Sequence, residues 1–116
     1  MIIFKDFTFE AAHKLPLVPK NHKCFNLHGH SFHVRVSVMG EINKLGWVMD
    51  FSDIKSICKP IIDNLDHSYL NDIQGLDNPT SENIAIWIWD KVKILIPNLN
   101  SVEVRETCNS GCIYSG

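Results

Sequence analysis

The sequence predicts an α+β fold in which an antiparallel sheet carries two helices on one face. Two hydrophobic periodicities support this prediction, because apolar residues alternate with polar ones near both ends of the chain and recur at helical spacing between them. Their order is strand, strand, strand, helix, helix, strand, which favours a four-stranded antiparallel sheet. The 116 residues, 45% hydrophobic and 21% charged, suit a single globular domain covering 1–116.

The first two predicted strands are joined by a loop that contains two prolines. Within the segment 5–13, Phe7, Phe9, Ala11 and His13 fall on one face of an extended chain. In the second strand the residues that share one face are His28, His30, Phe32, Val34, Val36 and Val38. Such alternation is typical of half-buried strands.

A short third strand and the first helix are predicted next. The strand is expected at 47–49, after a turn. Apolar residues then recur every three or four positions, which predicts a helix over about 52–65. Asp50 or Ser52 can cap its start. Pro60 lies inside this pattern and should kink the helix or shift its start.

The second helix and the fourth strand complete the predicted fold. Thr80 or Ser81 can cap the helix, and Pro97 is expected to end it. The apolar stripe of this helix comprises Ile84, Ile88, Val92 and Leu95. Alternation over 102–107 predicts the fourth strand, and the segment 111–116 is expected to extend it past a bulge.

Six histidines in a chain of this size are unusual, and three of them fall in phase. His28 and His30 are two residues apart on a predicted strand, so their side chains point to the same side. His13 lies on the matching face of the preceding strand, and a hairpin would bring the three imidazoles together. Three histidines with an open fourth position describe a catalytic zinc site. Gly29 allows the backbone to fit closely beside the ion.

Cys24 precedes this pair of histidines by four residues. Its thiol could itself bind zinc, or it could lie beside the site as a base or nucleophile. A buried structural role suits Cys24 poorly, because its neighbours are polar and loop-like. The same role suits Cys58 well, since Cys58 lies on the apolar stripe of the first helix.

Two acidic positions also suggest chemistry. Asp66 directly precedes His67, and such a carboxylate can orient the imidazole ring and stabilise its charged form. Glu106 is in phase with the apolar residues of the fourth strand, so its inward carboxylate needs a partner. That partner is an arginine or lysine, or a ligand with two parallel N–H donors, such as the guanidine-like edge of a purine or pterin.

The remaining histidines and cysteines are interpreted as structural. His22 lies in a loop and His33 is out of phase, so both are expected at the surface. Cys108 and Cys112 are separated by three residues, which favours a turn with a bulge over a metal site.

Net charge and hydropathy exclude several classes of function. The formal net charge is −2, which argues against a nucleic-acid binder. The N-terminal residues do not read as a secretory signal, and no apolar run approaches the ~18 residues of a spanning helix. We therefore expect a cytoplasmic protein with no membrane partner, whose four cysteines are not disulfide-bonded.

Five segments, taken together and in their order along the chain, resemble a known family. They are 4–13, 24–30, 65–67, 78–83 and 106–114. On these segments the sequence resembles the 6-pyruvoyl-tetrahydropterin synthase superfamily over essentially the whole chain. The resemblance implies the tunnelling fold (T-fold). Three residues separate Cys24 from His28, and this short spacer is similar to the bacterial branch that forms 6-carboxytetrahydropterin in queuosine biosynthesis.

The resemblance also implies a role for each motif. Zinc would be held by His13, His28 and His30. Cys24 would abstract a proton, with Asp66 and His67 as the opposing relay. Glu106 would anchor the pterin ring, and the residues expected near it are Thr107, Thr80, Ser81 and Glu82.

The implied reaction is a lyase reaction on a small pterin. It would convert 7,8-dihydroneopterin triphosphate to 6-carboxytetrahydropterin, acetaldehyde and triphosphate. A pyruvoyl-forming or sepiapterin-cleaving relative is an alternative, and a non-catalytic zinc- or pterin-binding module is another. The implied assembly is a homohexamer, a dimer of trimers with active sites at subunit interfaces. Candidates for holding the triphosphate are Lys14, Lys20, His22 and Lys23.

Overall fold

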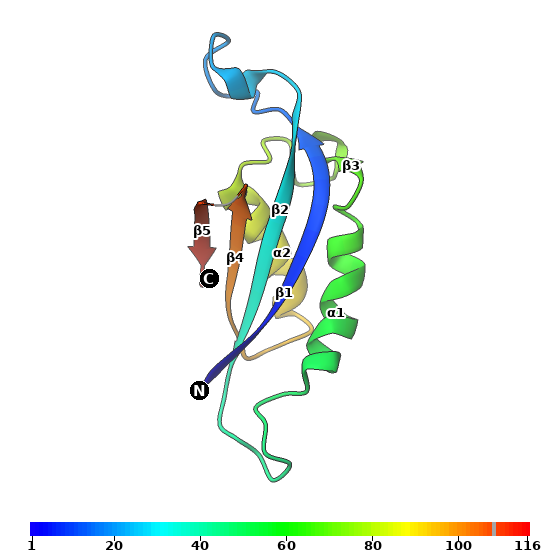
Figure 1. Cartoon of the computed structure of the whole chain (residues 1–116), viewed down its shortest axis with the longest axis vertical. Coiled ribbons are helices and arrows are strands. Elements are labelled where there is room, and N and C mark those ends of the chain that lie inside the picture. Colours follow the sequence, from blue (N-terminus) through cyan, green and yellow to red (C-terminus); the bar gives the residue numbers. More distant parts are fainter. Residues whose placement is uncertain (108) are drawn as a thin grey trace.

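The computed structural model describes residues 1–107 and 109–116 (Figure 1). The described residues form five strands, namely β1 (Ile2–His13), β2 (His28–Met39), β3 (Ser68–Tyr69), β4 (Leu99–Glu106) and β5 (Ser110–Tyr114). The two α-helices are α1 (Phe51–Asp63) and α2 (Ser81–Lys93), and two short 3-10 turns are η1 (Lys23–Phe25) and η2 (Leu70–Asp72). None of the described helices is long and apolar enough to cross a membrane.

The strands form one sheet in the order β3-β1-β2-β4-β5. All neighbouring pairs are antiparallel except β1 and β3, which are parallel. The long pair β1–β2 stays in register from Ile2 opposite Met39 to His13 opposite His28. Figure 1 shows α2 behind the sheet and α1 along its β1 side. The predicted α+β class, with two helices on one side of a mainly antiparallel sheet, is confirmed.

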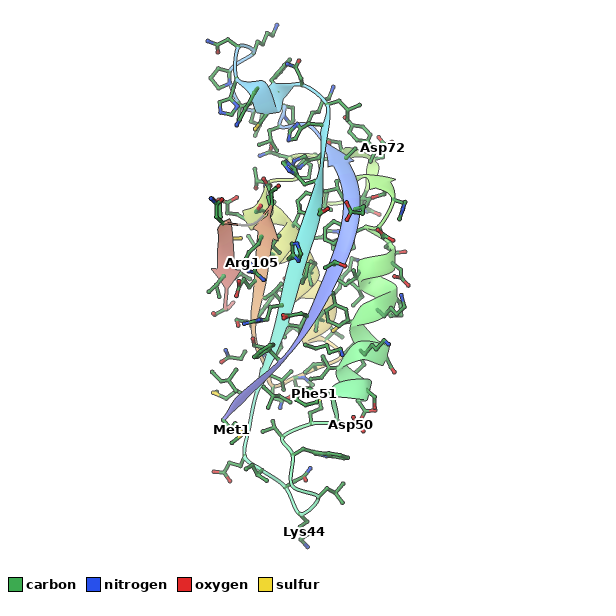
Figure 2. The ribbon with its side chains drawn as sticks, in the orientation of Figure 1. Met1, Lys44, Asp50, Phe51, Asp72 and Arg105 are labelled. Carbon is green, nitrogen blue, oxygen red and sulfur yellow. The ribbon has the colours of Figure 1, made fainter. Side chains whose placement is uncertain are left out.

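The third strand predicted at 47–49 is wrong, because the segment 40–50 forms a loop. Two of its backbone hydrogen bonds close within the loop: Asn43 N donates to Trp47 O at 2.9 Å, and Gly46 N donates to Asn43 O at 3.0 Å. A polar group satisfied within its own turn has no need of a sheet partner. Figure 2 shows Lys44 at the tip of this loop, at the end of the molecule opposite Asp72.

Two strands lie where the sequence did not indicate separate ones. The segment 111–116 does not extend β4, because the chain reverses direction and β5 pairs antiparallel with β4, placing Tyr114 opposite Val102. The reversal begins at Thr107, whose φ is +40°, and Asn109 N donates to Thr107 O at 2.8 Å. The two-residue strand β3 arises in a predicted loop and lies against Ala11 and Ala12 of β1.

Both helices begin at predicted caps. Asp50 Oδ1 accepts a hydrogen bond from Ser52 N at 2.9 Å at the start of α1, which continues past Pro60 to Asp63. Thr80 Oγ1 accepts from Asn83 N at 3.2 Å at the start of α2. Side-chain caps of this kind satisfy N–H groups that have no partner within the helix.

The end of α2 differs from the prediction. The helix stops at Lys93, so Leu95 lies outside it and is 56% exposed, whereas Ile96 is buried in the core. The turn that follows the helix rotates Leu95 off the apolar stripe. Two hydrogen bonds close this turn, because the N–H groups of Leu95 and Ile96 both donate to Val92 O.

The core lies between the sheet and the helices, and its aromatic part lies towards the His13 end of the sheet. Phe9 and Phe32 are directly opposed across β1 and β2, and their rings stack with centroids 4.7 Å apart. The Phe32 ring also meets the rings of His13 and His30 edge-on at 5.5 and 5.6 Å. The rings of His13 and His30 therefore pack against the stacked Phe9–Phe32 pair through Phe32.

Candidate metal centre and adjoining pockets

Three histidines meet on the helix-facing side of the sheet, as the sequence predicts. His13 and His28 are directly opposed in the β1–β2 register, and His30 lies diagonally across from His13, opposite Ala11. The ring centroids are 4.6, 4.8 and 5.2 Å apart. One potential ligand atom from each residue lies within 4.8 Å of the others.

The Nδ1 atom of each ring already has a partner. His13 Nδ1 lies 2.8 Å from Pro79 O, and His28 Nδ1 lies 2.7 Å from Asn26 O. A carbonyl oxygen only accepts, so these two rings carry their proton on Nδ1. That tautomer leaves the lone pair on Nε2, which is the usual arrangement of a metal-ligating histidine and its outer partner.

The free ring nitrogens fit a metal ion. Among the described residues, buried His13 Nε2 and His28 Nε2 have no hydrogen-bond partner. A buried polar atom without a partner is costly, and a cation shared between the rings would remove that cost. Burial, as the largest cause, lowers the pKa of His13, which favours the neutral imidazole that metals bind. These three residues can therefore hold a metal ion of the kind that imidazoles prefer.

A carboxylate borders this cluster on β4. Glu106 Oε2 lies 3.7 Å from His30 Nε2, and Glu106 Oε1 accepts a hydrogen bond from Ser81 Oγ at 2.7 Å. The side chain lies on the same face as Val102 and Val104, as predicted from its phase. The partner of this inward carboxylate is thus a hydroxyl and a neighbouring imidazole.

Glu106 also lines a cavity of about 430 Å³, called here the carboxylate pocket. Its polar lining comprises His22, Thr80, Ser81, Glu82, Glu106, Ser110 and Cys112. The structure therefore brings the predicted residues of the 80–82 segment together with Glu106. Thr107 instead turns away from this lining, and its Oγ1 lies 3.1 Å from His30 Nδ1.

Asp66 and His67 form a pair at the β1 edge of the sheet. Asp66 Oδ2 lies 2.9 Å from His67 Nδ1, and Asp66 Oδ1 accepts from Glu10 N at 2.9 Å. The Glu10 N–H, as the largest cause, and the His67 side chain hold the pKa of Asp66 below its ordinary value. His67 has φ +55°, and its own N–H donates to Glu10 O at 2.6 Å.

The His67 pair faces a different cavity from Glu106. The edge pocket, of about 530 Å³, has a lining that includes Glu10, Ala12, His30, Ser31, His67 and Ser68. His67 belongs only to this lining and Glu106 only to that of the carboxylate pocket. The His67 side chain is 81% exposed. Within one chain, the Asp66–His67 pair predicted to relay protons therefore faces a different pocket from Glu106, the predicted pterin anchor.

Cys24 lies in η1, within the loop that joins His13 to His28. The two ends of this loop carry metal-cluster residues, so Cys24 is at the same end of the sheet, as Figure 1 shows for η1. Among the described residues, its thiol is not part of the three-histidine group. Cys24 is partly buried and free.

His22 has a function that its sequence position did not reveal. Its Nδ1 accepts a hydrogen bond from Cys24 N at 3.1 Å and caps η1, and the residue also lines the carboxylate pocket. His22 is exposed, as expected of a surface histidine, and the cap and the pocket contact are additional to that expectation. His33 is also exposed as expected, opposite Thr8 on the far face of the sheet.

Asn71 is a second residue whose contacts the sequence did not indicate. Its side chain accepts from Lys14 N at 3.0 Å and donates to Lys14 O at 2.8 Å, so it ties the chain leaving β1 to η2. Its contribution depends on tertiary pairing over a long sequence separation, and no local motif signals it.

Burial raises the pKa of the thiol in both Cys58 and Cys112. Cys58 is fully buried, and this burial raises the pKa of its thiol to about 11, as suits the predicted structural role. Burial first, and then the nearby Glu82 carboxylate, raises the pKa of Cys112. The expected turn at Cys108 lies outside the described residues.

Comparison with known proteins places these features in context. The model of a family described as 6-pyruvoyl tetrahydropterin synthase matches residues 2–116. The chain is 51% identical over 120 residues to a Synechocystis protein named 6-carboxy-5,6,7,8-tetrahydropterin synthase, covering 97% of this chain and 92% of that protein. It is 43% identical over 90 residues to the dihydroneopterin monophosphate aldolase of Pyrococcus furiosus, covering 78% and 73%. The structure of Caenorhabditis elegans 6-pyruvoyl tetrahydropterin synthase matches with a TM-score of 0.91 at 28% identity, covering 100% of this chain and 95% of that one.

Proposed function

The chain belongs to the 6-pyruvoyl tetrahydropterin synthase family, and we propose that it is the zinc-dependent lyase that forms 6-carboxytetrahydropterin for queuosine biosynthesis. Its substrates would be 7,8-dihydroneopterin triphosphate and one water, which supplies the second carboxylate oxygen, and the other products would be acetaldehyde and triphosphate. The 51% identity to the Synechocystis relative supports this branch.

One observation carries the proposal. Two buried and unpartnered imidazole nitrogens and a third beside them converge next to the carboxylate of Glu106. A pocket of about 430 Å³ adjoins that carboxylate, and pockets of this size hold small ligands. Glu106 links the metal donor set to this pocket, since it lines the pocket and lies 3.7 Å from His30. A metal donor set so close to a small-molecule pocket favours an enzyme over a structural metal protein.

The metal would be held through the Nε2 atoms of His13, His28 and His30. Zinc is the ion that three neutral imidazoles with an open position suit. When bound, zinc would supply Lewis-acid polarisation of the substrate's side-chain hydroxyls. The Phe32 ring packs edge-on against the rings of His13 and His30 and would help to hold both ligands in place.

Glu106 would orient the pterin. Its two carboxylate oxygens can accept two parallel N–H groups from the pterin's guanidine-like edge, a bidentate pairing that fixes both position and angle. Ser81 Oγ donates to Oε1 and holds the carboxylate in place. A pterin bound in this way would have its side chain directed towards the histidine cluster.

Cys24 and the Asp66–His67 pair would move protons. In thiolate form Cys24 would take a proton from one side of the substrate side chain, and His67 would act on the other side. Asp66 receives the Glu10 N–H and pairs with His67 Nδ1, which leaves His67 Nε2 free for this work.

A neighbouring copy would complete the active site. His67 is 81% exposed and lines the edge pocket, whereas Glu106 lines the carboxylate pocket. Because one chain does not place these groups in one pocket, we propose that sheets join edge to edge into trimers and that two trimers form a homohexamer. The outer edge of β5 offers free backbone groups for such pairing.

The test uses variants that keep the metal. Cys24→Ala and His67→Ala should each lose at least ~100-fold in kcat, the usual contribution of a general acid or base, while still carrying one zinc per chain. A mass spectrum of the pterin product of the parent protein should identify 6-carboxytetrahydropterin. Lack of turnover by the zinc-loaded parent protein would favour the binding-module alternative, and a 6-pyruvoyl product would favour the pyruvoyl-forming alternative.

A further inference from the structure

The Nδ1 atom of His30 has the side-chain hydroxyl of Thr107 as its partner, whereas the Nδ1 atoms of His13 and His28 have main-chain carbonyl oxygens. His13 Nδ1 and His28 Nδ1 each meet a carbonyl oxygen, of Pro79 and Asn26. His30 Nδ1 instead meets Thr107 Oγ1 at 3.1 Å, a contact made across 77 residues of sequence. Among the described residues, Thr107 is thus the one side chain that contacts a cluster histidine at Nδ1.

The backbone of Thr107 is strained where this contact forms. Its φ of +40° is in the left-handed region, which a β-branched residue avoids. Such strain costs ~1–3 kcal/mol and persists only where the surroundings fix it. The Thr107 carbonyl accepts from Asn109 N at 2.8 Å, and its N–H lies 3.4 Å from Ser31 O. Glycine or asparagine would relieve the strain, and neither would offer the same hydroxyl.

The contact between Thr107 Oγ1 and His30 Nδ1 bears on whether His30 Nε2 is free to bind a metal. A hydroxyl can donate as well as accept, so the hydrogen bond alone allows either tautomer. His30 Nε2 lies 3.7 Å from Glu106 Oε2, which is too long for a hydrogen bond that would hold a proton there. One nitrogen of the His30 ring lies within 4.8 Å of a nitrogen of each of the other two rings. A hydroxyl that accepts from Nδ1–H is the arrangement that leaves Nε2 free.

We propose that Thr107 is a positioning residue of the metal centre, whose hydroxyl holds His30 in the Nδ1–H tautomer and so sets the affinity for zinc. This inference rests on the metal part of the proposed function. It assigns Thr107 to the metal rather than to the substrate. Since Thr107 directly follows Glu106, the same turn positions a metal ligand and the carboxylate of the adjoining pocket.

Three substitutions separate the hydroxyl from the other properties of Thr107. Thr107→Val keeps the branched shape and the strain but removes the hydroxyl. Thr107→Gly also removes the hydroxyl but adopts a positive φ without cost, so its turn should form even if valine prevents folding. Thr107→Ser keeps the hydroxyl and loses only the methyl group. Thr8→Val is the matched control, because Thr8 is exposed on the opposite face of the sheet.

The measurement is the zinc dissociation constant of each purified protein, obtained by competition with a chelator, with no substrate present. Loss of an outer hydrogen bond to a ligating histidine typically weakens metal binding about 10–100-fold. We expect that weakening for the valine and glycine variants, and values within about threefold of the parent for serine and Thr8→Val.

Each other outcome overturns a defined claim. Parent-like affinity in the glycine variant would overturn the role of Thr107 and leave the proposed function standing. Weak binding by the serine variant would show that the methyl group acts instead of the hydroxyl, and would also overturn it. If the parent protein binds no zinc at the three histidines, both this inference and the metal part of the proposed function fail.

Discussion

His22 shows how one side chain can link two parts of a site. Its Nδ1 caps the turn that carries Cys24, and its ring lines the carboxylate pocket. The Nδ1 atom accepts from the Cys24 N–H, which fixes the orientation of the His22 ring relative to the turn. His22 therefore acts as a positioning residue for Cys24 in the proposed reaction.

Replacing His22 should lower kcat without removing the metal. His22→Ala deletes the cap, and a cap is worth ~1 kcal/mol, so we expect kcat to fall about threefold to tenfold as Cys24 loses its fixed position. His22→Asn offers a similar acceptor and should recover most of the activity. Steady-state kinetics check this, with His33→Ala on the far sheet face as the control. Equal losses in the alanine and asparagine variants would contradict the capping role.

At the scale of the elements, β1 and β2 form the frame of the site. Their register places His13 opposite His28, and it also places Asp6 opposite Arg35 on the other face. Arg35 Nε and Nη2 donate to the two carboxylate oxygens of Asp6 at 2.8 and 3.0 Å. The hydrogen bond from Arg35, as the largest cause, lowers the pKa of Asp6.

Because of the Asp6–Arg35 pair, the free energy of unfolding should depend on pH. Because the folded pKa of Asp6 is below the unfolded value of about 3.9, its contribution is fully present above that pH and is lost as pH falls through the folded pKa. The Asp6 side chain is half-exposed, so solvent screening limits the contribution to about 1 kcal/mol. Asp6→Asn should lower the free energy of unfolding by that amount at pH 7, and the difference from the parent should vanish well below pH ~3.9.

Denaturant unfolding at several pH values measures this difference. The matched control is Asp63→Asn, which removes an i,i+4 pair with Lys59 on the surface of α1 and should have a smaller effect at pH 7. A difference between Asp6→Asn and the parent that stays constant from pH 7 to pH 3 would contradict the electrostatic account.

Some elements could be predicted from the sequence because their signal is local and long. The alternation in β1 and β2 predicts both strands, and it also places His13, His28 and His30 on one face. β3 has two residues, too few for a periodicity, and it exists because His67 N and the chain after it bond to the edge of β1. The apolar run at 47–49 resembles a strand, but it lies in a loop in which Trp47 O accepts from Asn43 N.

The candidate site also has residues that a local pattern predicts and residues that it does not. The alternation of apolar residues in β4 predicts that Glu106 points inward, and the structure agrees. The contacts of His22, Asn71 and Thr107 depend on how a loop or turn folds over residues distant in sequence, so no local pattern indicates them. The family resemblance implies that Thr107 lies near the pterin, and the structure shows in addition that its left-handed turn directs its hydroxyl to His30.

At the scale of the whole molecule, one chain is elongated. Its extents are 56 × 22 × 22 Å, and its radius of gyration is 15.1 Å, compared with about 13.4 Å expected for a compact chain of this length. Large apolar side chains are exposed on the 40–50 loop and on β5, including Leu45 at 74% and Ile113 at 68%. An elongated sheet with exposed apolar residues and free edges suits an assembly of several copies.

The assembly has a direct physical test. Light scattering on the purified protein should give a mass close to six times the 13.2 kDa of one chain. Dilution into a chaotropic salt that separates the copies should abolish turnover together with the large mass, because the proposed site needs His67 and Glu106 from different copies. A fully active monomer would contradict the shared site.

The central claim is that this chain cleaves its pterin substrate between side-chain carbons rather than only eliminating triphosphate. The most direct measurement is the ratio of acetaldehyde to triphosphate released when the zinc-loaded protein consumes 7,8-dihydroneopterin triphosphate. The proposed reaction releases the two in equal amounts, with 6-carboxytetrahydropterin as the pterin product. Triphosphate released without acetaldehyde would contradict the claim.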